Sequence, residues 1–368
     1  MCKIYIEDCC EILDSMRIPI TASDRKEGKY PYYGANGLQD HVAEYIFDDE
    51  LVLLAEDGGN FGSKERPIAY RVSGKCWVNN HAHVLKPKDG LNVDYLCYAL
   101  MFYNVEGIVN GATRQKLTQA AMRKMMIPKK TMDEQINIVD KLNKVVEIKN
   151  KRQIELKELN NLIKARFIEL FGDVSTNPNG YPIKNFDEIS ILITDGEHAT
   201  PRRADKGIYL LSARNVLNHM LQLNDVDYID EDEYNRIARR VVPQAGDVLI
   251  SCSGSIGRCC VVPDGLKFQM VRSAALIRFN ETINPVFAEW LMTSDDLQQQ
   301  IAQSATQSSQ ANLFQGKIRK LYGYVPPIEL QNQFASFVEQ TDKSKVAVQK
   351  ALDEAQLLFD SLMQKYFG

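Results

Sequence analysis

A long, proline-free segment in the middle of the chain, residues 133–172, constrains the fold more than any other stretch. Pro128 precedes it, and Gly172 and Pro178 follow it, as the start and stop signals of a helix should. A helix of about 39 residues at ~1.5 Å rise would extend roughly 58 Å, too far for the packing helix of one compact domain. Its apolar residues recur at intervals of three and four, the period of a helix with one apolar face: Ile136, Val139, Leu142, Val146, Leu159, Ile163, Phe167 and Leu170.

A second segment of the same kind ends the chain, residues 329–368, and its seven-residue repeat is clearer. The two segments also match at their ends. At their beginnings, residues 126–139 (MIPKKTMDEQINIV) align with residues 324–337 (YVPPIELQNQFASF). At their ends, both long segments finish in Phe-Gly, at 171–172 and 367–368. Two matched helices at the midpoint and the end predict an internal duplication. The alternative, two unrelated coiled-coil helices, does not account for the shared Ile-Pro or Val-Pro start and the shared Phe-Gly end.

The segments between the helices predict strands and short turns rather than further long helices. In the first half we expect strands at 51–54, 68–72 and 77–85 that form a meander. The second half repeats the order of elements. We therefore predict an α+β fold: two β-rich globular domains, joined by two long antiparallel helices that form a coiled coil, with an internal pseudo-two-fold duplication. The expected divisions are a first domain at 1–130, a central helical spacer at 131–172, a second domain at 173–325 and a C-terminal helical spacer at 326–368.

The composition is that of a soluble globular protein, with 45% hydrophobic and 25% charged residues. No apolar run reaches the ~18 residues of a membrane span, and the N-terminus does not resemble a signal peptide. The eight cysteines form no CxxC pair, so we expect reduced thiols and a cytoplasmic location. A zinc site that combined Cys9, Cys10 and a distant histidine is the less favoured alternative.

Charge is distributed unevenly within a chain whose net charge is only −4. Residues 1–59 hold 5 basic and 13 acidic residues, a net −8, whereas residues 60–130 hold 12 basic and 4 acidic residues, a net +8. A basic surface within an acidic chain is typical of a nucleic-acid-binding protein whose other faces bind protein. Charges scattered over a solvated surface would give the same totals, so composition leaves both interpretations open.

The sequence contains none of the common catalytic motifs. There is no GxGxxG after a strand, no GxxxxGK[ST] and no HExxH, and residues 177–180 (NPNG) lack the second proline and the aromatic ring of an amino-methyltransferase motif. The five histidines have no evident acid or nucleophile partner in the sequence, so core or surface roles are favoured over metal binding: His41, His81, His83, His198 and His219. We therefore predict a chain that is not an enzyme and that holds no metal and no cofactor.

Two polar loops occupy the same place in each half, just before the segment that leads into the long helix. Arg, Gln, Asn and Thr are the side chains that contact base edges or phosphates, although each of them alone is also common in solvated loops. Gly58, Gly59, Gly62, Gly254 and Gly257 would let a backbone approach a phosphate, but as glycines alone they favour plain turns. The predicted DNA contacts are Asn36, Gln39, Lys64, Arg66, Arg114, Gln115, Lys116, Arg202, Arg203, Arg214, Asn215, Arg258, Gln307 and Gln310.

Over essentially its whole length the chain resembles the specificity (S) subunits of type I restriction–modification systems. One departure is IPKK at 127–130, where the family pattern prefers Pro-Pro. The pieces that carry the resemblance are YYGANG at 32–37, GATRQKLT at 111–118, IPKKTMDEQINIV at 127–139, GDVLISCSGSIGR at 246–258, SSQANLFQGKIR at 308–319 and VPPIELQNQFASFV at 325–338.

The resemblance implies a non-catalytic subunit with two target-recognition domains, each of which recognises one half of a split, gapped site in double-stranded DNA. Two helical spacers would hold the domains apart, with half-sites about one turn (~10 bp) apart, and bind two methyltransferase (M) subunits. Through them the chain would associate with up to two restriction (R) subunits, with S-adenosylmethionine and ATP bound on those partners. Two other hypotheses remain: a duplicated protein-interaction scaffold without DNA binding, and an enzyme whose catalytic residues carry no motif.

Overall fold

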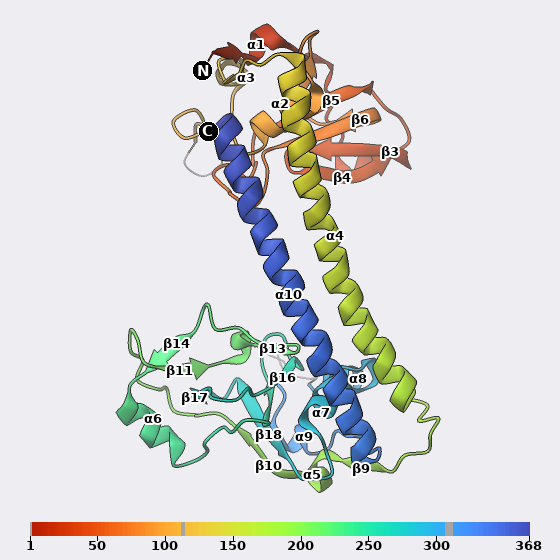
Figure 1. Ribbon diagram of the computed structural model, residues 1–368, viewed down its shortest axis with the longest axis vertical. Coiled ribbons are helices and arrows are strands. Elements are labelled where there is room, and N and C mark those ends of the chain that lie inside the picture. The colour runs from red at the N-terminus through yellow and green to blue at the C-terminus, as the bar shows by residue number, and fades with distance from the viewer. Residues whose placement is uncertain (1, 112–114, 306–311) are drawn as a thin grey trace. The chain divides into compact units, whose positions relative to one another are not determined.

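The chain divides into two compact units. Unit 1 comprises Met1–Ile154 together with Gln349–Gly368, and unit 2 comprises Glu155–Val348. The boundary crosses both long helices, so each unit contains one part of each helix (Figure 1). The computed structural model describes residues 2–111, 115–305 and 312–368.

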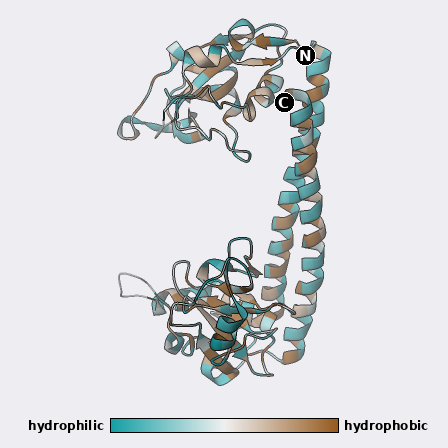
Figure 2. Cartoon of the chain, turned by 90° about the vertical axis from the view of Figure 1, so that its left-hand side faces the viewer, coloured by the Kyte–Doolittle hydropathy of each residue, from teal (hydrophilic) through white to brown (hydrophobic). Residues whose placement is uncertain are grey.

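The two long helices, α4 (Met132–Phe171) and α10 (Ile328–Phe367), are 40 residues each, and both confirm the prediction from the sequence. A capping box begins α4: the Glu134 amide donates to Thr131 Oγ1 at 3.3 Å, and the Thr131 amide donates to the Glu134 carboxylate at 2.9 Å. Gly172, at φ 77°, ends α4 in the left-handed conformation that a glycine adopts without strain. Hydrophobic residues recur along both helices (Figure 2).

In unit 1, the beginning of α4 packs against the end of α10. Val139 and Leu142 of α4 share one buried cluster with Ala355 and Phe359 of α10. In unit 2, the contacts join the opposite ends of the same helices, because Phe167 near the end of α4 packs edge-on against Phe334 near the beginning of α10, with 5.4 Å between ring centroids. The two helices are therefore antiparallel, as the sequence predicted.

The β-rich part of unit 1 is built on a six-stranded sheet of order β2-β7-β5-β6-β3-β4. All neighbours are antiparallel except β3 and β6, which pair in parallel through Tyr32 and Trp77. The predicted meander is wrong, because β6 and β7 lie on either side of β5 and do not pair with each other. The strands are β1 (Lys3–Tyr5), β2 (Cys10–Ile12), β3 (Glu27–Gly34), β4 (Gly37–Val42), β5 (Phe47–Ala55), β6 (Ala69–Val78), β7 (Ala82–Pro87) and β8 (Met126–Pro128).

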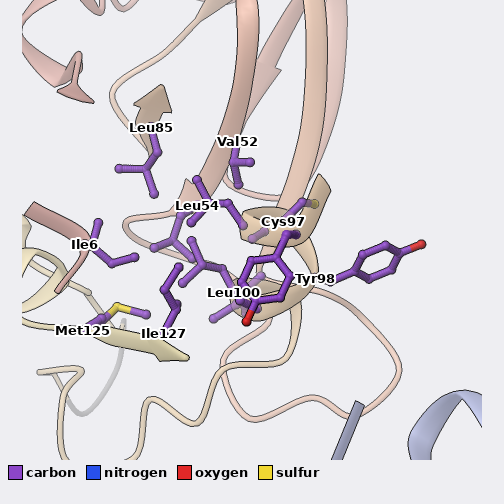
Figure 3. Close-up of a cluster of buried hydrophobic side chains, with 14 of the residues drawn as sticks. Ile6, Val52, Leu54, Leu85, Cys97, Tyr98, Leu100, Met125 and Ile127 are labelled. Carbon is purple, nitrogen blue, oxygen red and sulfur yellow. The ribbon is translucent and has the colours of Figure 1, made fainter. Parts of the chain in front are cut away.

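The helices of unit 1 close one face of this sheet. Helix α2 contributes Leu96 and Leu100, both fully buried, to a cluster that also contains Leu54 of β5 and Ile127 of β8 (Figure 3). The shorter helices are α1 (Ile6–Cys9), η1 (Asp14–Met16), η2 (Ala22–Asp24), α2 (Val93–Met101) and α3 (Gln119–Arg123).

Unit 2 distributes its strands over smaller sheets. A four-stranded antiparallel sheet has the order β10-β18-β15-β16, and a three-stranded sheet β14-β11-β17 contains one parallel pair, β11 with β17. The strands are β9 (Ile183–Asn185), β10 (Ser190–Asp195), β11 (Ile208–Leu211), β12 (Val216–Leu217), β13 (Met220–Leu221), β14 (Asp227–Ile229), β15 (Val248–Ser251), β16 (Cys259–Val261), β17 (Phe268–Met270), β18 (Ala274–Phe279) and β19 (Tyr322–Tyr324). The shorter helices are α5 (Phe186–Ile189), η3 (Ala213–Asn215), α6 (Glu231–Ala238), α7 (Pro285–Met292), α8 (Asp295–Ser304) and α9 (Gln315–Ile318).

Corresponding elements recur at the start of the β-rich part of each unit and at the start of the long helix that follows it. Each β-rich part begins with a three-residue strand, a four-residue helix and a second strand, and the first strand pairs with the strand before the long helix: β1 with β8, and β9 with β19. Each long helix also carries a buried glutamine four residues into its sequence. Gln135 accepts from the Asn92 amide and Gln331 accepts from the Asn284 amide, both at 2.8 Å. These shared contacts are what a duplication would produce, while a symmetry axis between the units stays a prediction.

Two further observations concern burial and hydropathy. Cys2 is exposed, and the other seven cysteines are buried as free thiols. Within the described residues, no helix combines the length and the apolar character that crossing a membrane would need.

Candidate nucleic-acid interface

Three loops of unit 1 converge, although they are far apart in the sequence. The side-chain amide of Asn36, in the turn between β3 and β4, donates to the Gly58 carbonyl at 2.9 Å. The Gly58 amide in turn donates to the Gln115 carbonyl at 3.3 Å. Lys116 Nζ lies 3.0 Å from the Glu56 carboxylate. The structure thus brings together Asn36, Gln115 and Lys116, three of the predicted DNA contacts, and all three are exposed.

The other described residues that were predicted in unit 1 lie on β4 and in the loop between β5 and β6. Gln39 on β4 is exposed and accepts from the Asn79 side-chain amide at 3.1 Å. Lys64 and Arg66 are exposed in the loop between β5 and β6, the same loop that carries Gly58. Arg114 lies outside the described residues.

A cluster of charged side chains anchors these loops to the sheet. Asp14, Glu56 and His83 each place one ligand atom within 4.8 Å of the others, which is the spacing of a metal site. However, both carboxylates are already engaged by protein side chains: Arg17 donates to Glu56 at 2.6 Å, and His83 Nδ1 lies 2.7 Å from Asp14. We therefore interpret the cluster as an ion-pair network rather than a metal centre.

The network keeps both carboxylates ionised in spite of their burial. Burial by itself raises the pKa of Asp14, but hydrogen bonds from His83 and Gln119 outweigh it, and the pKa lies below its usual value. Burial likewise raises the pKa of Glu56, and hydrogen bonds from Arg17 and Lys116 lower it overall.

Unit 2 contains a cavity of about 430 Å³ whose lining includes two arginines and four serines. Arg214 comes from η3, and Arg258 comes from the loop between β15 and β16. Two guanidinium groups and several hydroxyls, with no carboxylate among the lining residues, match the oxygens of a phosphate. The lining consists of Ser212, Ala213, Arg214, Ser253, Gly254, Ser255, Arg258 and Ser273.

Local hydrogen bonds position the walls of this cavity. The Arg258 guanidinium donates to Ser255 Oγ at 2.6 Å, and the Ala213 amide donates to Ser273 Oγ at 3.1 Å. Gly254 adopts φ 70°, a conformation that a side chain would strain. Both arginines were predicted from the sequence, but the four serines were not, and the letters SCSGS at 251–255 were a signal for Ser253 and Ser255 alone.

Acidic neighbours partly neutralise the predicted arginines of unit 2. Arg203 Nε lies 3.1 Å and Arg214 Nη2 lies 3.2 Å from the carboxylate of Asp227, the first residue of β14. Arg202 lies 2.9 Å from Asp230. All three arginines are exposed, so a DNA phosphate would compete with these ion pairs instead of meeting unpaired cations.

Asn215 corrects one expectation from the sequence. Its side chain is fully buried, and its amide nitrogen donates to the carbonyls of Gln222 and Asp225, both at 2.9 Å. Its oxygen accepts from the Ser212 amide at 2.9 Å and from the Ser212 hydroxyl at 3.1 Å. Both the oxygen and the nitrogen of the Asn215 side-chain amide are hydrogen-bonded within the protein, so Asn215 stabilises the 212–225 segment. Because the side chain is fully buried, it cannot contact DNA.

The two polar loops that precede the long helices make equivalent backbone hydrogen bonds in their units, through Leu313 and Leu117. In unit 2 the Leu313 amide donates to the Cys252 carbonyl at 2.9 Å, and in unit 1 the Leu117 amide donates to the Glu56 carbonyl at 2.7 Å. In each case the loop before the long helix joins the loop that follows a central strand. Gln307 and Gln310 lie outside the described residues.

Comparisons with known proteins agree with this architecture. Residues 3–158 match the family described as the type I restriction modification DNA specificity domain. The chain is 26% identical over 353 residues to the putative type I restriction enzyme specificity subunit S.HindORF215P of Haemophilus influenzae, which covers 91% of this chain and 86% of that protein. It is 25% identical over 123 residues to the type I restriction enzyme EcoprrI specificity subunit of Escherichia coli, which covers 33% of this chain and 29% of that one.

Solved structures share the fold at low sequence identity. The S subunit of a type I restriction–modification system from M. genitalium aligns with a TM-score of 0.61 at 14% identity, over 100% of this chain and 96% of that one. A chain from a study of complex assembly and conformational transition in a type I R-M system aligns with a TM-score of 0.56 at 14% identity, over 99% and 97%. By the domain at residues 3–158, by its relatives and by its fold, the chain is similar to the specificity subunits of type I restriction–modification systems.

Proposed function

We propose that this chain recognises a bipartite, gapped site in double-stranded DNA and directs methyltransferase subunits to it. Unit 1 recognises one half-site through its converging loops, and unit 2 recognises the other through the surface around the Arg214–Arg258 cavity. The chain itself is the non-catalytic component, and S-adenosylmethionine and ATP bind to its partners. It acts in the cytoplasm.

The observation that carries this proposal is the cavity of unit 2. Its two guanidinium groups and four serine hydroxyls form a donor-rich recess of the kind that holds a backbone phosphate. A phosphate contact fixes the position of a protein on DNA, while neighbouring side chains recognise the bases. The exposed amide and ammonium groups of Asn36, Gln115 and Lys116 supply the corresponding donors in unit 1.

The long helices supply surfaces for the partner subunits. Although both helices bury an apolar face, several of their large apolar side chains remain exposed, which is typical of a protein–protein contact. We propose that methyltransferase subunits, two per chain, dock there, and that restriction subunits join through them. The exposed residues are Met132, Ile136, Ile148, Ile154, Leu162 and Ile168 on α4, and Val346, Leu357 and Leu358 on α10.

The test begins with the complex of this chain and its cognate methyltransferase subunit. Long-read sequencing of a host genome, with and without the two genes, should show one gapped motif that is methylated only when both are present. No such motif would reject the proposal and favour the alternative of a protein-interaction scaffold.

The cavity is tested by Arg258→Ala, with Arg239→Ala as the matched control, since Arg239 is exposed in unit 2 but does not line the cavity. If Arg258 contacts a phosphate, its loss weakens binding to specific and non-specific duplexes alike. The slope of log K against log salt should then fall in magnitude by about one. An unchanged slope in Arg258→Ala, or an equal change in Arg239→Ala, would remove the cavity from the interface.

A further inference from the structure

His83, on β7 of unit 1, is fully buried and bonded at both ring nitrogens. Nδ1 lies 2.7 Å from Asp14 Oδ2, and Nε2 lies 2.8 Å from the Leu117 carbonyl oxygen. Leu117 belongs to the loop that carries Gln115 and Lys116. One histidine thus joins the sheet to a loop with predicted DNA contacts.

The identity of its two partners determines the charge of His83. A carbonyl oxygen can only accept, so Nε2 must carry a proton. Asp14 is ionised and already accepts from the Val84 amide at 2.9 Å and from the Gln119 side chain at 2.9 Å. Facing an acceptor there as well, Nδ1 must also carry a proton. Both ring nitrogens are therefore donors, and the geometry is that of an imidazolium.

Among the residues that the structure describes, the charged groups around His83 come from three segments. Asp14 comes from η1, Glu56 follows β5 with its carboxylate 3.7 Å from Nδ1, and each is bound by a further cation. Arg17 pairs with both carboxylates, at 3.6 Å from Asp14 and 2.6 Å from Glu56, and Lys116 pairs with Glu56 at 3.0 Å. The network therefore links the sheet, the loop after β5 and Lys116 itself.

Backbone hydrogen bonds show which part of the loop the network holds. Asn110 and Lys116 exchange two of them, Asn110 N to Lys116 O at 3.0 Å and Lys116 N to Asn110 O at 2.7 Å. The Leu117 amide donates to the Glu56 carbonyl at 2.7 Å, while the Leu117 carbonyl accepts from His83. The base of the loop is closed by these bonds, and Leu117 is bound on both sides.

We propose that His83 is a positioning residue for DNA recognition by unit 1: as a buried imidazolium it fixes the Lys116–Leu117 base of the loop against the Asp14–Glu56 pair. This inference rests on the proposed function. When His83 loses one proton, one of its nitrogens presents a lone pair to an oxygen, either that of Asp14 or that of Leu117. The repulsion releases one side of the loop, and Gln115 and Lys116 lose their fixed position.

The protonation state is measured on the full chain without DNA. Imidazole ¹⁵N spectra over about pH 5.5 to 9 should show both His83 nitrogens protonated at the lower end. Hydrogen exchange of the Leu117 amide should speed up as His83 titrates. A His83 ring that carries only one proton across the whole pH range overturns the proposal. This measurement uses the unmodified chain, so it does not depend on whether a variant folds.

The link to DNA uses His83→Gln, with His41→Gln on exposed β4 as the matched control. In complexes with the methyltransferase subunit, the affinity of the parent and of His41→Gln for the methylated motif should fall about five- to tenfold as His83 titrates. His83→Gln should bind weakly at all pH values and lose this dependence. A pH profile that His83→Gln retains overturns the proposal.

The two levels of failure are separable. If no complex recognises any motif while the spectra and the exchange data behave as expected, the proposed function falls and, with it, the role of His83 in recognition. If the motif is methylated but the pH profile does not follow His83, only the positioning role falls.

Discussion

Each long helix has a buried glutamine near its beginning, and replacing it by alanine should destabilise only the unit that contains it: unit 1 for Gln135 and unit 2 for Gln331. Gln331 is fully buried, and its side chain donates to the carbonyls of Thr282 at 3.0 Å and Pro326 at 2.8 Å while it accepts from the Asn284 amide. Gln331→Ala leaves these three backbone groups without their partner. At about 1 kcal/mol net for each bond, the loss is about 3 kcal/mol.

The matching change in unit 1 should cost slightly less. Gln135 makes the equivalent three bonds, to Gly90 at 2.9 Å, to Lys130 at 3.0 Å and from Asn92 at 2.8 Å. These bonds are only part-buried, whereas the bond between Gln331 and Pro326 is buried, so water can replace some of them. We expect about 2 kcal/mol for Gln135→Ala.

The chain contains two tryptophans, one in each unit, and these allow the units to be followed separately. Trp77 and Trp290 are buried, at 8% and 7% exposed, so their fluorescence should change on unfolding. Urea titrations of Trp290→Phe chains report unit 1, and those of Trp77→Phe chains report unit 2.

The controls are Gln153→Ala on α4 and Gln340→Ala on α10, both at exposed positions, which should change stability by less than about 0.5 kcal/mol. The reasoning fails if either buried glutamine costs less than about 1 kcal/mol in its own unit. It also fails if Gln331→Ala shifts the Trp77 transition as much as the Trp290 transition.

Three further predictions concern packing, the corrected asparagine and acid. Phe167→Ala should destabilise unit 2 by about 3–5 kcal/mol in urea, because its ring stacks within a cluster of four phenylalanines. Asn215→Ala should lower the thermal midpoint of unit 2, whereas the salt slope of DNA binding, measured well below that midpoint, should stay as in the parent. The pKa values of Asp14 and Glu56 are lowered in the folded state, so their stabilisation is complete above about pH 5 and is lost as the pH falls below about 4. Urea midpoints that remain constant from pH 7 to pH 3 would contradict this.

The long helices could be predicted from the sequence because their signals are local. The apolar period, Pro128 and Gly172 placed the first helix at 133–172, within one residue of Met132–Phe171. The strands were harder, because pairing is decided by contacts between distant residues. The predicted meander failed because β7 pairs with the other side of β5 instead of with β6, and no turn motif between β6 and β7 indicates that choice.

The candidate site was predictable in residue type but not in environment. Loop position and polarity predicted Lys116 and Arg258 as contacts. In the structure Lys116 pairs with Glu56, and Arg258 lines the cavity of unit 2. No pattern in the sequence distinguished Asn215, whose amide is used inside the protein, from its exposed neighbour Arg214. The pairing of Arg214 with Asp227 could not be predicted either, because twelve residues lie between them along the chain.

Because both units contain buried cysteines, the alkylation of these thiols can report the opening of each unit separately. Alkylating reagents attack thiolates, and burial raises the pKa of Cys97 in unit 1 and of Cys252 in unit 2 to about 12. In the folded chain a maleimide therefore meets Cys2 first. Mass spectrometry of the labelled peptides would then record which half had opened, and how often, at concentrations of denaturant far below any visible transition.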